Sequence, residues 1–514
     1  MNPLLNIYSD TVAGILEGER GPHIGAFFDF DGTLISGYSV VPFLWEQLYD
    51  GLLMPSDLSE AVKAALAMKV GAATYGELME DAAHKLRGVR EQTYIRYGKD
   101  AYEAKVARMI YPESRALILA HLQMGHTVAI VSSATPYQVE PALTDLQVEH
   151  LECTHFDVDR GYFTGQLDGE VCFGVGKVNA VNRLCDEFGC ELQKSYFYSD
   201  SDDDIEVLEH VGRPQVLNPN DNLRRLAETR GWPIRSFESR GTRKAANVAR
   251  NLAAVSSFVP TALTGAAMWW LTGSKAEGRN FIISTFSDLA TALMGLKIEV
   301  RGSNNLWSHR PAVVIFNHQS NVDSLVLSKL MRRDAAAVGK KELSELPIIG
   351  PIFDFLGMIP IDRSNTVAAV QTLEPLAELM HREQRSVVIA PEGTRSLSAH
   401  PGRFKKGPFR IAMQAGVPIV PVVIHNSSDA QPKGDLFARP TTIAVDVLEP
   451  IDVSEWTLDD LDDRIDSVRE LYLQVLDQQN HALDGGPRQT SVAGRDADVI
   501  DLYRERKDRS RNPQ

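Results

Sequence analysis

The sequence predicts an α/β protein with two domains joined by a hydrophobic helical segment. Three observations lead to this prediction: a length of 514 residues, strand-like apolar runs that alternate with helical patterns in both halves, and an uncharged apolar stretch between them. Domains usually contain about 50 to 250 residues, so this chain needs at least two hydrophobic cores. Alternating strands and helices are typical of parallel sheets covered by helices.

Composition and charge narrow the class of protein. With 44% hydrophobic and 24% charged residues the chain is globular, and its net charge of -15 disfavours nucleic acid as a partner. Its four cysteines show no C-x-x-C spacing of a zinc site, so we expect reduced thiols. The first 25 residues contain acidic side chains and no long apolar run, which argues against a cleaved secretory signal.

The first domain is predicted over residues 1–238. Three expected strands each end in a polar cluster, in "IGAFFDFDGT", "HTVAIVSSAT" and "KSYFYSDSDDD". Ligands of a parallel sheet collect at the carboxyl ends of its strands, so we expect these clusters to form one site. Between the first two strands, residues 40–120 show apolar side chains three or four apart, which predicts helices.

Paired carboxylates end the first of these strands. Asp29 and Asp31 lie two residues apart, and such side chains share one face of a strand. Their repulsion calls for a cation or a proton, and Mg²⁺ prefers oxygen ligands of this kind. The third cluster offers further oxygens from Asp200, Asp203 and Asp204, although a solvated acidic loop is the alternative for that run alone.

Taken in order, "DFDGT", "VSS", "GKVNAV" and "YSDSDDD" resemble the four motifs of the haloacid dehalogenase-like phosphatases, in particular the phosphoserine-phosphatase-like branch, subfamily IB. The resemblance implies a Rossmann-like fold with a helical cap. It implies that Asp29 attacks phosphorus to give an aspartyl-phosphate, and that Asp31 protonates the leaving oxygen. Ser132 and Lys177 would hold the phosphoryl group, and Mg²⁺ would be bound by Asp29, the carbonyl of Asp31, and Asp200, with Asp204 or Asp203 as support.

The sequence departs from that branch at one position. Tyr38 stands nine residues after Asp29, where phosphoserine phosphatases carry a glutamate that reads the substrate amino group. The arginine that would match the one binding the substrate carboxylate is not found in "GELMEDAAHKLRG". An uncharged or lipid-like phosphomonoester fits an aromatic pocket better, and phosphoserine is kept as the alternative substrate.

A basic linker and hydrophobic helices are predicted over residues 239–297. No charged residue occurs between Asn251 and Ser274, and paired tryptophans stand at 269 and 270. A second apolar stretch covers 281–296. An interfacial or re-entrant membrane anchor is favoured, because Trp prefers the membrane interface; one or two spanning helices and buried soluble helices are the alternatives.

The second domain is predicted over residues 298–485 and is followed by a disordered tail at 486–514. Its strands include "PAVVIFNH", "SVVIAPEG" and "VPIVPVVI". His318 and Asp323 are five residues apart, so on one helix they would diverge by about 140°. They can meet only if His318 lies in a loop and Asp323 just inside the following helix, where the carboxylate would make the imidazole a better base. The alternative is a surface histidine beside an unrelated capping aspartate.

Four blocks, "NHQSNVD", "GMIPIDR", "APEGTRS" and "VPIVPVVI", resemble those of the glycerophosphate acyltransferases, specifically the 1-acylglycerol-3-phosphate acyltransferase family, over about 300–450. The resemblance implies the glycerolipid acyltransferase αβ fold. It implies that His318 takes the proton of an acceptor hydroxyl, which attacks an acyl thioester, while Asp323 orients the imidazole. The expected substrate-binding residues are Glu392, Gly393, Thr394, Arg395, Arg363 and Lys340.

The combined expectation is a bifunctional enzyme at the cytoplasmic face of the cell membrane. It would make phosphatidic acid from lysophosphatidic acid, with acyl-CoA or acyl carrier protein as donor, and would also hydrolyse a phosphomonoester with Mg²⁺. Two alternatives remain open at this point: a front domain that only senses a phosphorylated ligand, and a phosphatase whose rear domain is degenerate and only binds lipid.

Overall fold

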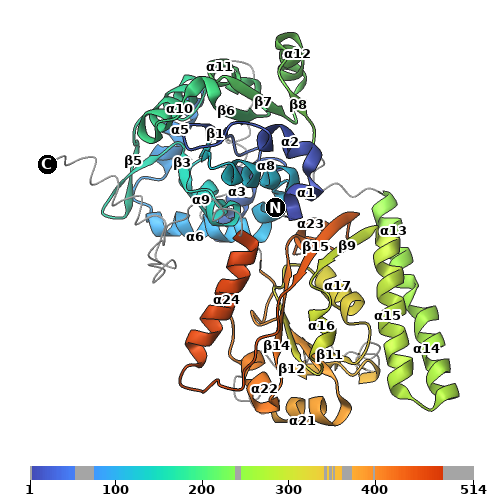
Figure 1. Ribbon diagram of the computed structural model, residues 1–514. Coiled ribbons are helices and arrows are strands. Elements are labelled where there is room, and N and C mark those ends of the chain that lie inside the picture. The colour runs from blue at the N-terminus through green and yellow to red at the C-terminus, as the bar shows by residue number, and fades with distance from the viewer. Residues whose placement is uncertain are drawn as a thin grey trace. The chain divides into compact units, whose positions relative to one another are not determined.

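The computed structural model of the chain contains two compact units (Figure 1). The N-terminal unit comprises Gly18–Val106 and His121–Ser236, and the C-terminal unit comprises Phe237–Gln478 with Met1–Glu17 and Ala107–Ala120. The structure describes residues 3–51, 74–237, 245–340, 344–345, 350, 354–361, 373–396, 400–433 and 435–477. The predicted site residue Arg363 and the predicted tail at 486–514 lie outside these ranges.

A six-stranded parallel sheet forms the core of the N-terminal unit, in the order β3-β2-β1-β6-β7-β8. Its strands are β1 (Gly25–Phe28), β2 (Thr127–Val131), β3 (His150–Glu152), β6 (Tyr196–Ser199), β7 (Arg213–Leu217) and β8 (Ile234–Arg235). Phe28 of β1 pairs with Ile130 of β2 on one side and with Tyr198 of β6 on the other. The loops after these three strands therefore meet at one edge of the sheet, as the sequence predicts.

A smaller aromatic core lies in the cap of the N-terminal unit. It is built by α3 (Val40–Tyr49), α5 (Tyr75–Lys85), α6 (Glu91–Ala101), α9 (Pro136–Leu146) and the antiparallel hairpin of β4 (Phe156–Asp159) and β5 (Tyr162–Leu167). The ring of Tyr94 meets the rings of Phe43, Tyr137 and Phe163 edge to face. The sequence predicted the helices of this cap but not the hairpin, which comes from a later part of the chain.

The chain up to residue 237 also contains helices outside the sheet and the cap. The sheet strands are connected by α10 (Val175–Phe188), α11 (Ile205–His210) and α12 (Asp221–Arg230). The other elements up to residue 237 are α1 (Pro3–Ile7), α2 (Ser9–Leu16), η1 (Tyr102–Val106), α7 (Ala107–Met109), α8 (Pro112–Gln123), η2 (Leu192–Lys194) and η3 (Asp202–Asp204).

The C-terminal unit contains a seven-stranded sheet in the order β12-β11-β13-β10-β14-β15-β9. Its strands are β9 (Leu296–Arg301), β10 (Val313–Phe316), β11 (Ala335–Lys340), β12 (Ile359–Ile361), β13 (Ser386–Ile389), β14 (Ile419–Ile424) and β15 (Thr441–Val447). All neighbouring pairs are parallel except β14 with β15. Each of the two α/β units thus has its own sheet, which confirms the predicted fold class.

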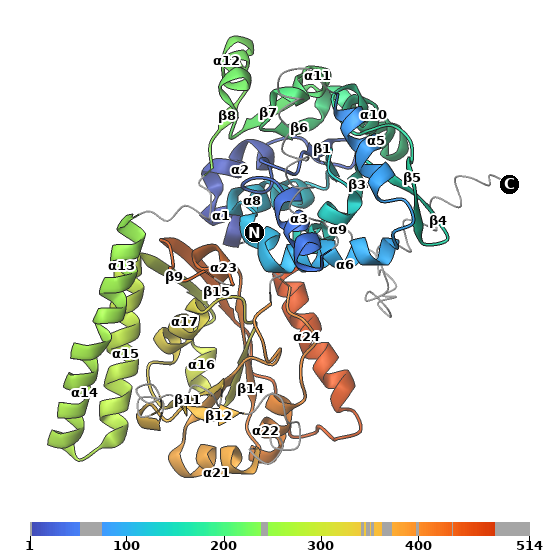
Figure 2. The same cartoon turned by 180° about the vertical axis from the view of Figure 1, so that it is seen from behind.

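Helices cover both faces of this sheet, as Figures 1 and 2 show from opposite sides. They are α15 (Lys275–Met294), α16 (Asn305–Ser308), α17 (Val322–Met331), α21 (Leu373–Glu383), α22 (Gly407–Ala415), α23 (Ser427–Ala430) and α24 (Leu461–Asp477). From α24, the buried phenol of Tyr472 donates to the carbonyl of Ile315 in β10 (2.8 Å) and accepts from the N–H of Val422 in β14 (3.2 Å). This bridge ties α24 to two central strands.

The apolar segment before the sheet forms α13 (Ala245–Ser256) and α14 (Phe258–Thr272), and α14 packs against α15. Among the described helices one run, Ala245–Thr272, is long and apolar enough to cross a membrane, and only 17% of its apolar window is buried. The second predicted stretch, 281–296, lies mostly in α15, which packs on α17 and carries Asp288 paired with Lys329 at 3.0 Å. Large exposed apolar side chains are therefore more frequent on α13 and α14 than on α15.

Candidate functional site

The first candidate site lies after β10 in the C-terminal unit. His318 follows the strand in a loop, and Asp323 is the second residue of α17. The Nδ1 atom of His318 lies 2.8 Å from the Oδ2 atom of Asp323, and the same oxygen accepts the N–H groups of Gln319 and Ser320 at 2.8 Å. The geometry that the spacing predicted is confirmed. Because a carboxylate only accepts hydrogen bonds, the buried Asp323 favours the tautomer in which Nδ1 of His318 donates and Nε2 is the free acceptor.

Polar side chains fix the loop that carries His318. The amide of Asn317 donates to the carbonyl of Ile424 (2.8 Å) and accepts its N–H (2.7 Å), so it joins the loop to the end of β14. The hydroxyl of Ser320 donates to the carbonyl of Gln431 at 2.7 Å. Sequence reasoning missed Asn317 and Ser320, although both stand inside the "NHQSNVD" block.

Glu392 supports the same loop from the end of β13. Its Oε1 atom accepts the N–H of His318 at 2.9 Å, and its Oε2 atom accepts the N–H of Gly402 at 3.0 Å. Burial raises the pKa of Glu392 to about 7, although both backbone donors oppose this shift. Glu392 was predicted to bind substrate, and its observed contacts are with the backbone around the site.

Of the other predicted substrate-binding residues, one lines the cavity beside His318 and the rest have different surroundings. Gly393 has φ of 73° and lines the cavity, and a Cβ atom there would come within 2.8 Å of the Nζ atom of Lys405. The Nη1 atom of Arg395 donates to the Oδ1 atom of Asn321 at 2.8 Å. Thr394 is exposed, and Lys340 ends β11, where its backbone pairs with that of Ile361.

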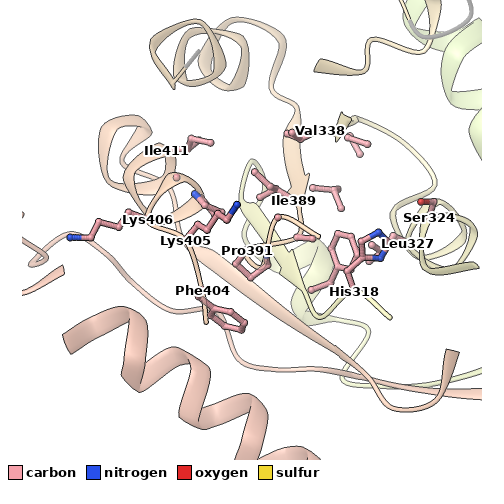
Figure 3. Close-up of a pocket in the computed structure, with 18 of the residues that line it drawn as sticks. His318, Ser324, Leu327, Val338, Ile389, Pro391, Phe404, Lys405, Lys406 and Ile411 are labelled. Atoms are coloured by element: carbon pink, nitrogen blue, oxygen red, sulfur yellow. The ribbon is translucent and has the colours of Figure 1, made fainter. Parts of the chain in front are cut away.

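An apolar cavity of about 820 Å³ opens beside His318 (Figure 3). Its wall comes from α15, α17, β11, β13 and the segment at 354–358; among its apolar members are Ile283, Leu327, Met331, Val338, Leu356 and Ile389. Basic side chains line one side, at Arg403, Lys405, Lys406 and Arg410. Figure 3 shows that Lys405 points toward Ile389, whereas Lys406 points away and pairs with Asp462 at 2.7 Å. Lys405 was missed, and its signal was the basic run in "RFKKGPF".

The second candidate site lies at the strand ends of the N-terminal unit. The buried Nζ atom of Lys177 is 2.7 Å from Oδ1 of Asp29 and 2.8 Å from Oδ2 of Asp204. Thr33 donates to Oδ1 of Asp200 at 3.1 Å, and a Cβ atom at Gly32 would meet the Asp200 carboxylate at 2.1 Å. The structure therefore brings the predicted Asp29, Lys177 and Asp200 together.

Burial dominates the electrostatics of this site. It raises the pKa of Asp29 to about 6, that of Asp31 to about 7 and that of Asp200 to about 8, and the neighbouring carboxylates contribute. Lys177 opposes the shift at Asp29, and hydrogen bonds from the N–H and hydroxyl of Ser39 oppose it at Asp31. A divalent cation would stabilise the charged forms, so these acids fit the predicted magnesium.

No three acidic, histidine or cysteine side chains in the described part of the chain converge closely enough to hold a metal ion by themselves. The ligand set that the sequence implies, the side chains of Asp29 and Asp200 with the carbonyl of Asp31, stays a prediction. Asp204 is engaged by Lys177 and by the hydroxyl of Ser199 at 2.7 Å.

Aromatic rings stand at the mouth of this site. The hydroxyl of Tyr75 donates to the carbonyl of Ser133 at 2.7 Å, and its ring stacks on Phe173 at 4.6 Å. Ser132 follows β2 directly and is buried, and its hydroxyl accepts the N–H of Ala134. Tyr38 is 64% exposed. Sequence reasoning missed Tyr75 and Phe173, because only the folded cap brings them together.

Two family patterns match separate stretches of the chain. The acyltransferase family pattern matches residues 297–425, and the haloacid dehalogenase-like hydrolase pattern matches residues 26–209. A solved structure described as a phospho-aspartyl intermediate analogue of phosphoserine phosphatase is 17% identical, with a TM-score of 0.33, and covers 42% of this chain and 94% of that chain.

Two curated relatives are acyltransferases by name. The 1-acyl-sn-glycerol-3-phosphate acyltransferase of Limnanthes alba is 34% identical over 36% of this chain, and the chain spans 65% of its length. The 1-acyl-sn-glycerol-3-phosphate acyltransferase beta of Homo sapiens is 33% identical over 41% of this chain, with 79% of that protein covered. The chain belongs to the 1-acyl-sn-glycerol-3-phosphate acyltransferase family through its C-terminal unit, and it carries a haloacid dehalogenase-like hydrolase domain in front.

Proposed function

We propose that the C-terminal unit moves an acyl chain from an acyl thioester to the free hydroxyl of 1-acylglycerol-3-phosphate, making phosphatidic acid. The observation that carries this proposal is the buried His318–Asp323 pair at the wall of a large apolar cavity. The imidazole supplies a base, and the cavity can hold an acyl chain away from water.

Each residue of the pair has a distinct part in the reaction. Asp323 accepts Nδ1–H and fixes the tautomer, so the Nε2 atom of His318 takes the proton of the acceptor hydroxyl. The hydroxyl oxygen then forms a bond to the thioester carbonyl carbon, and the carbon–sulfur bond breaks. The departing thiolate takes the proton from the imidazolium, which restores the base. Glu392 keeps the loop in place by holding the backbone N–H of His318.

The phosphate of the acceptor needs local cations, because the chain as a whole is negatively charged. We assign it to Arg395, with Arg363 and Lys340 as further partners and Thr394 beside them. A guanidinium can hold phosphate oxygens through two parallel hydrogen bonds. The positive φ of Gly393 lets the backbone approach such a ligand without a Cβ clash. The acyl donor is acyl-CoA or acyl carrier protein.

For the N-terminal unit we propose a phosphomonoester hydrolase that uses Mg²⁺ and an aspartyl-phosphate. Asp29 attacks phosphorus while Asp31, whose pKa burial raises to about 7, gives its proton to the leaving oxygen. The Asp31 carboxylate then takes a proton from water, whose oxygen bonds to phosphorus as the bond to Asp29 breaks, so phosphate is released and both acids are restored. Lys177 and Ser132 hold the phosphoryl oxygens. Mg²⁺ bound by Asp29, Asp200 and the carbonyl of Asp31 would neutralise phosphoryl charge.

We propose that the substrate of this hydrolase is an uncharged or lipid-like phosphomonoester. The exposed phenol of Tyr38 and the stacked pair of Tyr75 and Phe173 support this choice, since rings favour apolar groups. Phosphoserine is less suitable, because a tyrosine stands where its amino group would need a carboxylate.

We further propose that α13 and α14 attach the protein to the cytoplasmic face of the cell membrane, lying in the interface. Large apolar side chains on these helices are exposed; they are Leu252, Val255, Val259, Leu263, Trp269, Trp270 and Leu271. Contiguous exposed apolar residues mark an interaction surface, and tryptophans favour the membrane interface.

The direct test uses the purified full chain in two assays. Acyl transfer is measured with lysophosphatidic acid in vesicles and a radiolabelled acyl-CoA, and phosphate release with a panel of phosphomonoesters and Mg²⁺. Wild-type protein should be active in both assays. His318→Ala should lose acyl transfer and keep phosphate release. Asp29→Asn should lose phosphate release and keep acyl transfer. Together these results would assign one reaction to each unit. Full acyl transfer by His318→Ala would remove the assignment of the base.

A further inference from the structure

One face of α15 carries two basic side chains, which lie between the α14–α15 turn and the wall of the cavity. Lys275, Arg279 and Ile283 are spaced four residues apart, so they share this face. Lys275 is exposed, and its Nζ atom lies 5.7 Å from the ring centre of Phe355. Ile283 lines the apolar cavity. Arg279 stands between them.

Arg279 is only 7% exposed. Its guanidinium makes no hydrogen bond or ion pair with any residue that the structure describes, and its Nε atom is buried without an acceptor. A buried guanidinium needs a partner, because taking its charge out of water is unfavourable. The guanidinium of Arg279 would therefore be stabilised by a bound anion.

Arg385, which is 2% exposed, lies close enough for its charge and that of Arg279 to repel each other. Its Nη2 atom donates to the carbonyls of Ala335 (2.7 Å) and Gly357 (3.0 Å), and its Nε atom is also buried without an acceptor. Burial and the charge of Arg279 lower the pKa of Arg385. A second buried cation within electrostatic range of Arg279 strengthens the need for a negative ligand.

The nearby acids have other partners. Asp334 accepts from Asn280 at 3.0 Å and from Arg333 at 3.0 Å. Glu277 lies 3.8 Å from Arg333. Glu383 is the one acid within ion-pair distance of Arg385 among the described residues, at 3.4 Å, and it is partly exposed and shared with Arg382. These carboxylates do not reach Arg279.

We propose that Arg279 and Arg385 bind a phosphate group carried by an anionic phospholipid of the membrane. Arg385 immediately precedes β13 and Arg395 follows it, so this site and the proposed acceptor site lie at opposite ends of that strand. The apolar cavity beside Ile283 and the exposed surface of α14 give the acyl chains an apolar environment. Lys275 adds an outer positive charge. The inference rests on the proposed membrane attachment through α13 and α14.

The test measures binding of the full chain to two kinds of vesicle, phosphatidylcholine alone and phosphatidylcholine with phosphatidylglycerol. Arg279→Gln is compared with Arg250→Gln, which removes the same charge from an exposed position on α13. Because hydrogen bonds to a charged group are lost, Arg279→Gln should weaken binding to anionic vesicles about tenfold or more. Arg250→Gln should weaken it by no more than about fivefold, the loss expected for one charge near an anionic surface, and neither change should alter binding to neutral vesicles.

Equal loss in the two variants would overturn the site, because it would reduce the effect to general charge attraction. Wild-type protein that binds both kinds of vesicle equally would overturn the site and leave the attachment intact. Protein that binds neither kind would overturn the attachment, and the lipid as the ligand with it.

Thermal unfolding supplies a second measurement that separates ligand binding from a structural role. Without lipid, Arg279→Gln should unfold at or above the wild-type temperature, since it removes an uncompensated buried charge. A clear drop would mean that Arg279 stabilises the fold and would overturn the proposal. Anionic vesicles should raise the unfolding temperature of wild type and leave that of Arg279→Gln unchanged. An equal rise with millimolar inorganic phosphate alone would identify a soluble phosphate as the ligand and overturn the lipid source.

Discussion

The Oδ2 atom of Asp323 holds three donors at 2.8 Å, the Nδ1 atom of His318 and the N–H groups of Gln319 and Ser320. One carboxylate oxygen therefore sets the tautomer of the histidine and also the shape of the loop that carries it. The following predictions test this arrangement and the other features of the two sites.

Asp323→Asn should lower kcat/KM for acyl transfer by about a thousandfold or more. The amide can keep the loop hydrogen bonds through its oxygen, but it no longer stabilises the imidazolium that forms when His318 takes a proton. The measurement is initial-rate acyl transfer to lysophosphatidic acid. Asp288→Asn, on the partly exposed surface of α15, serves as the control and should retain near-normal rates. Near-normal transfer by Asp323→Asn would contradict the proposed pair.

The stability that Glu392 contributes should depend on pH. Burial raises its pKa from 4.5 to about 7, so the folded protein binds the proton more tightly than the unfolded chain. The favourable contribution is complete below pH 4.5 and is lost as pH rises through 7, by about 3 kcal/mol in total. The free energy of unfolding of the wild-type protein in urea should therefore exceed that of Glu392→Gln by more at pH 5 than at pH 8. A difference that stays constant with pH would contradict the raised pKa.

Asp29→Asn should reduce phosphate release at least about a thousandfold, because the amide cannot form the aspartyl-phosphate. Asp186→Asn is the matched control, because Asp186 is exposed on α10 and belongs to neither proposed site. It should keep most of the activity. If neither wild type nor Asp29→Asn releases phosphate from any of the esters, the front domain is better explained as a ligand sensor.

Chelation of divalent metal should separate the two activities. In the proposed reaction Mg²⁺ stabilises the charged forms of Asp29 and Asp200, so EDTA should abolish phosphate release and added Mg²⁺ should restore it. Acyl transfer uses an imidazole base and should continue at its normal rate. Both rates are measured on the same sample, and acyl transfer that falls with phosphate release would contradict independent chemistry in the two units.

Trp270→Ala should weaken binding to neutral vesicles about tenfold or more. The side chain is 83% exposed on α14, and its transfer into the interface contributes favourable free energy on the order of 2 kcal/mol. Leu458→Ala is the control, because Leu458 is also exposed but lies outside the hairpin. Vesicle sedimentation measures both, and an equal effect of the two changes would contradict attachment through α14.

The sequence predicted those features that depend on local spacing. The five-residue separation of His318 and Asp323 requires a loop followed by a helix, and β10 and α17 provide it. The polar ends of β1, β2 and β6 also followed from their apolar patterns, because parallel strands bring such ends together. In the same way, Asp29 and Lys177 meet across 148 residues of sequence.

Features that depend on burial could not be predicted in this way. A pattern of residues does not show that both oxygens of Glu392 face backbone N–H groups, or that Lys405 lies over Gly393. Nor does it show that Arg279 and Arg385 are enclosed, since lysines and arginines are usually solvated. These properties arise when separate elements pack together, and they change the chemistry expected of each side chain.

The phenol bridge of Tyr472 has a consequence for how the protein is made. Strand β10 is anchored by a hydroxyl that lies more than 150 residues further along the chain, in the last described helix. During synthesis on the ribosome, the strand that precedes His318 thus stays without this anchor until α24 has emerged. Nascent chains halted before residue 472 should accordingly show rapid amide hydrogen exchange at Val422.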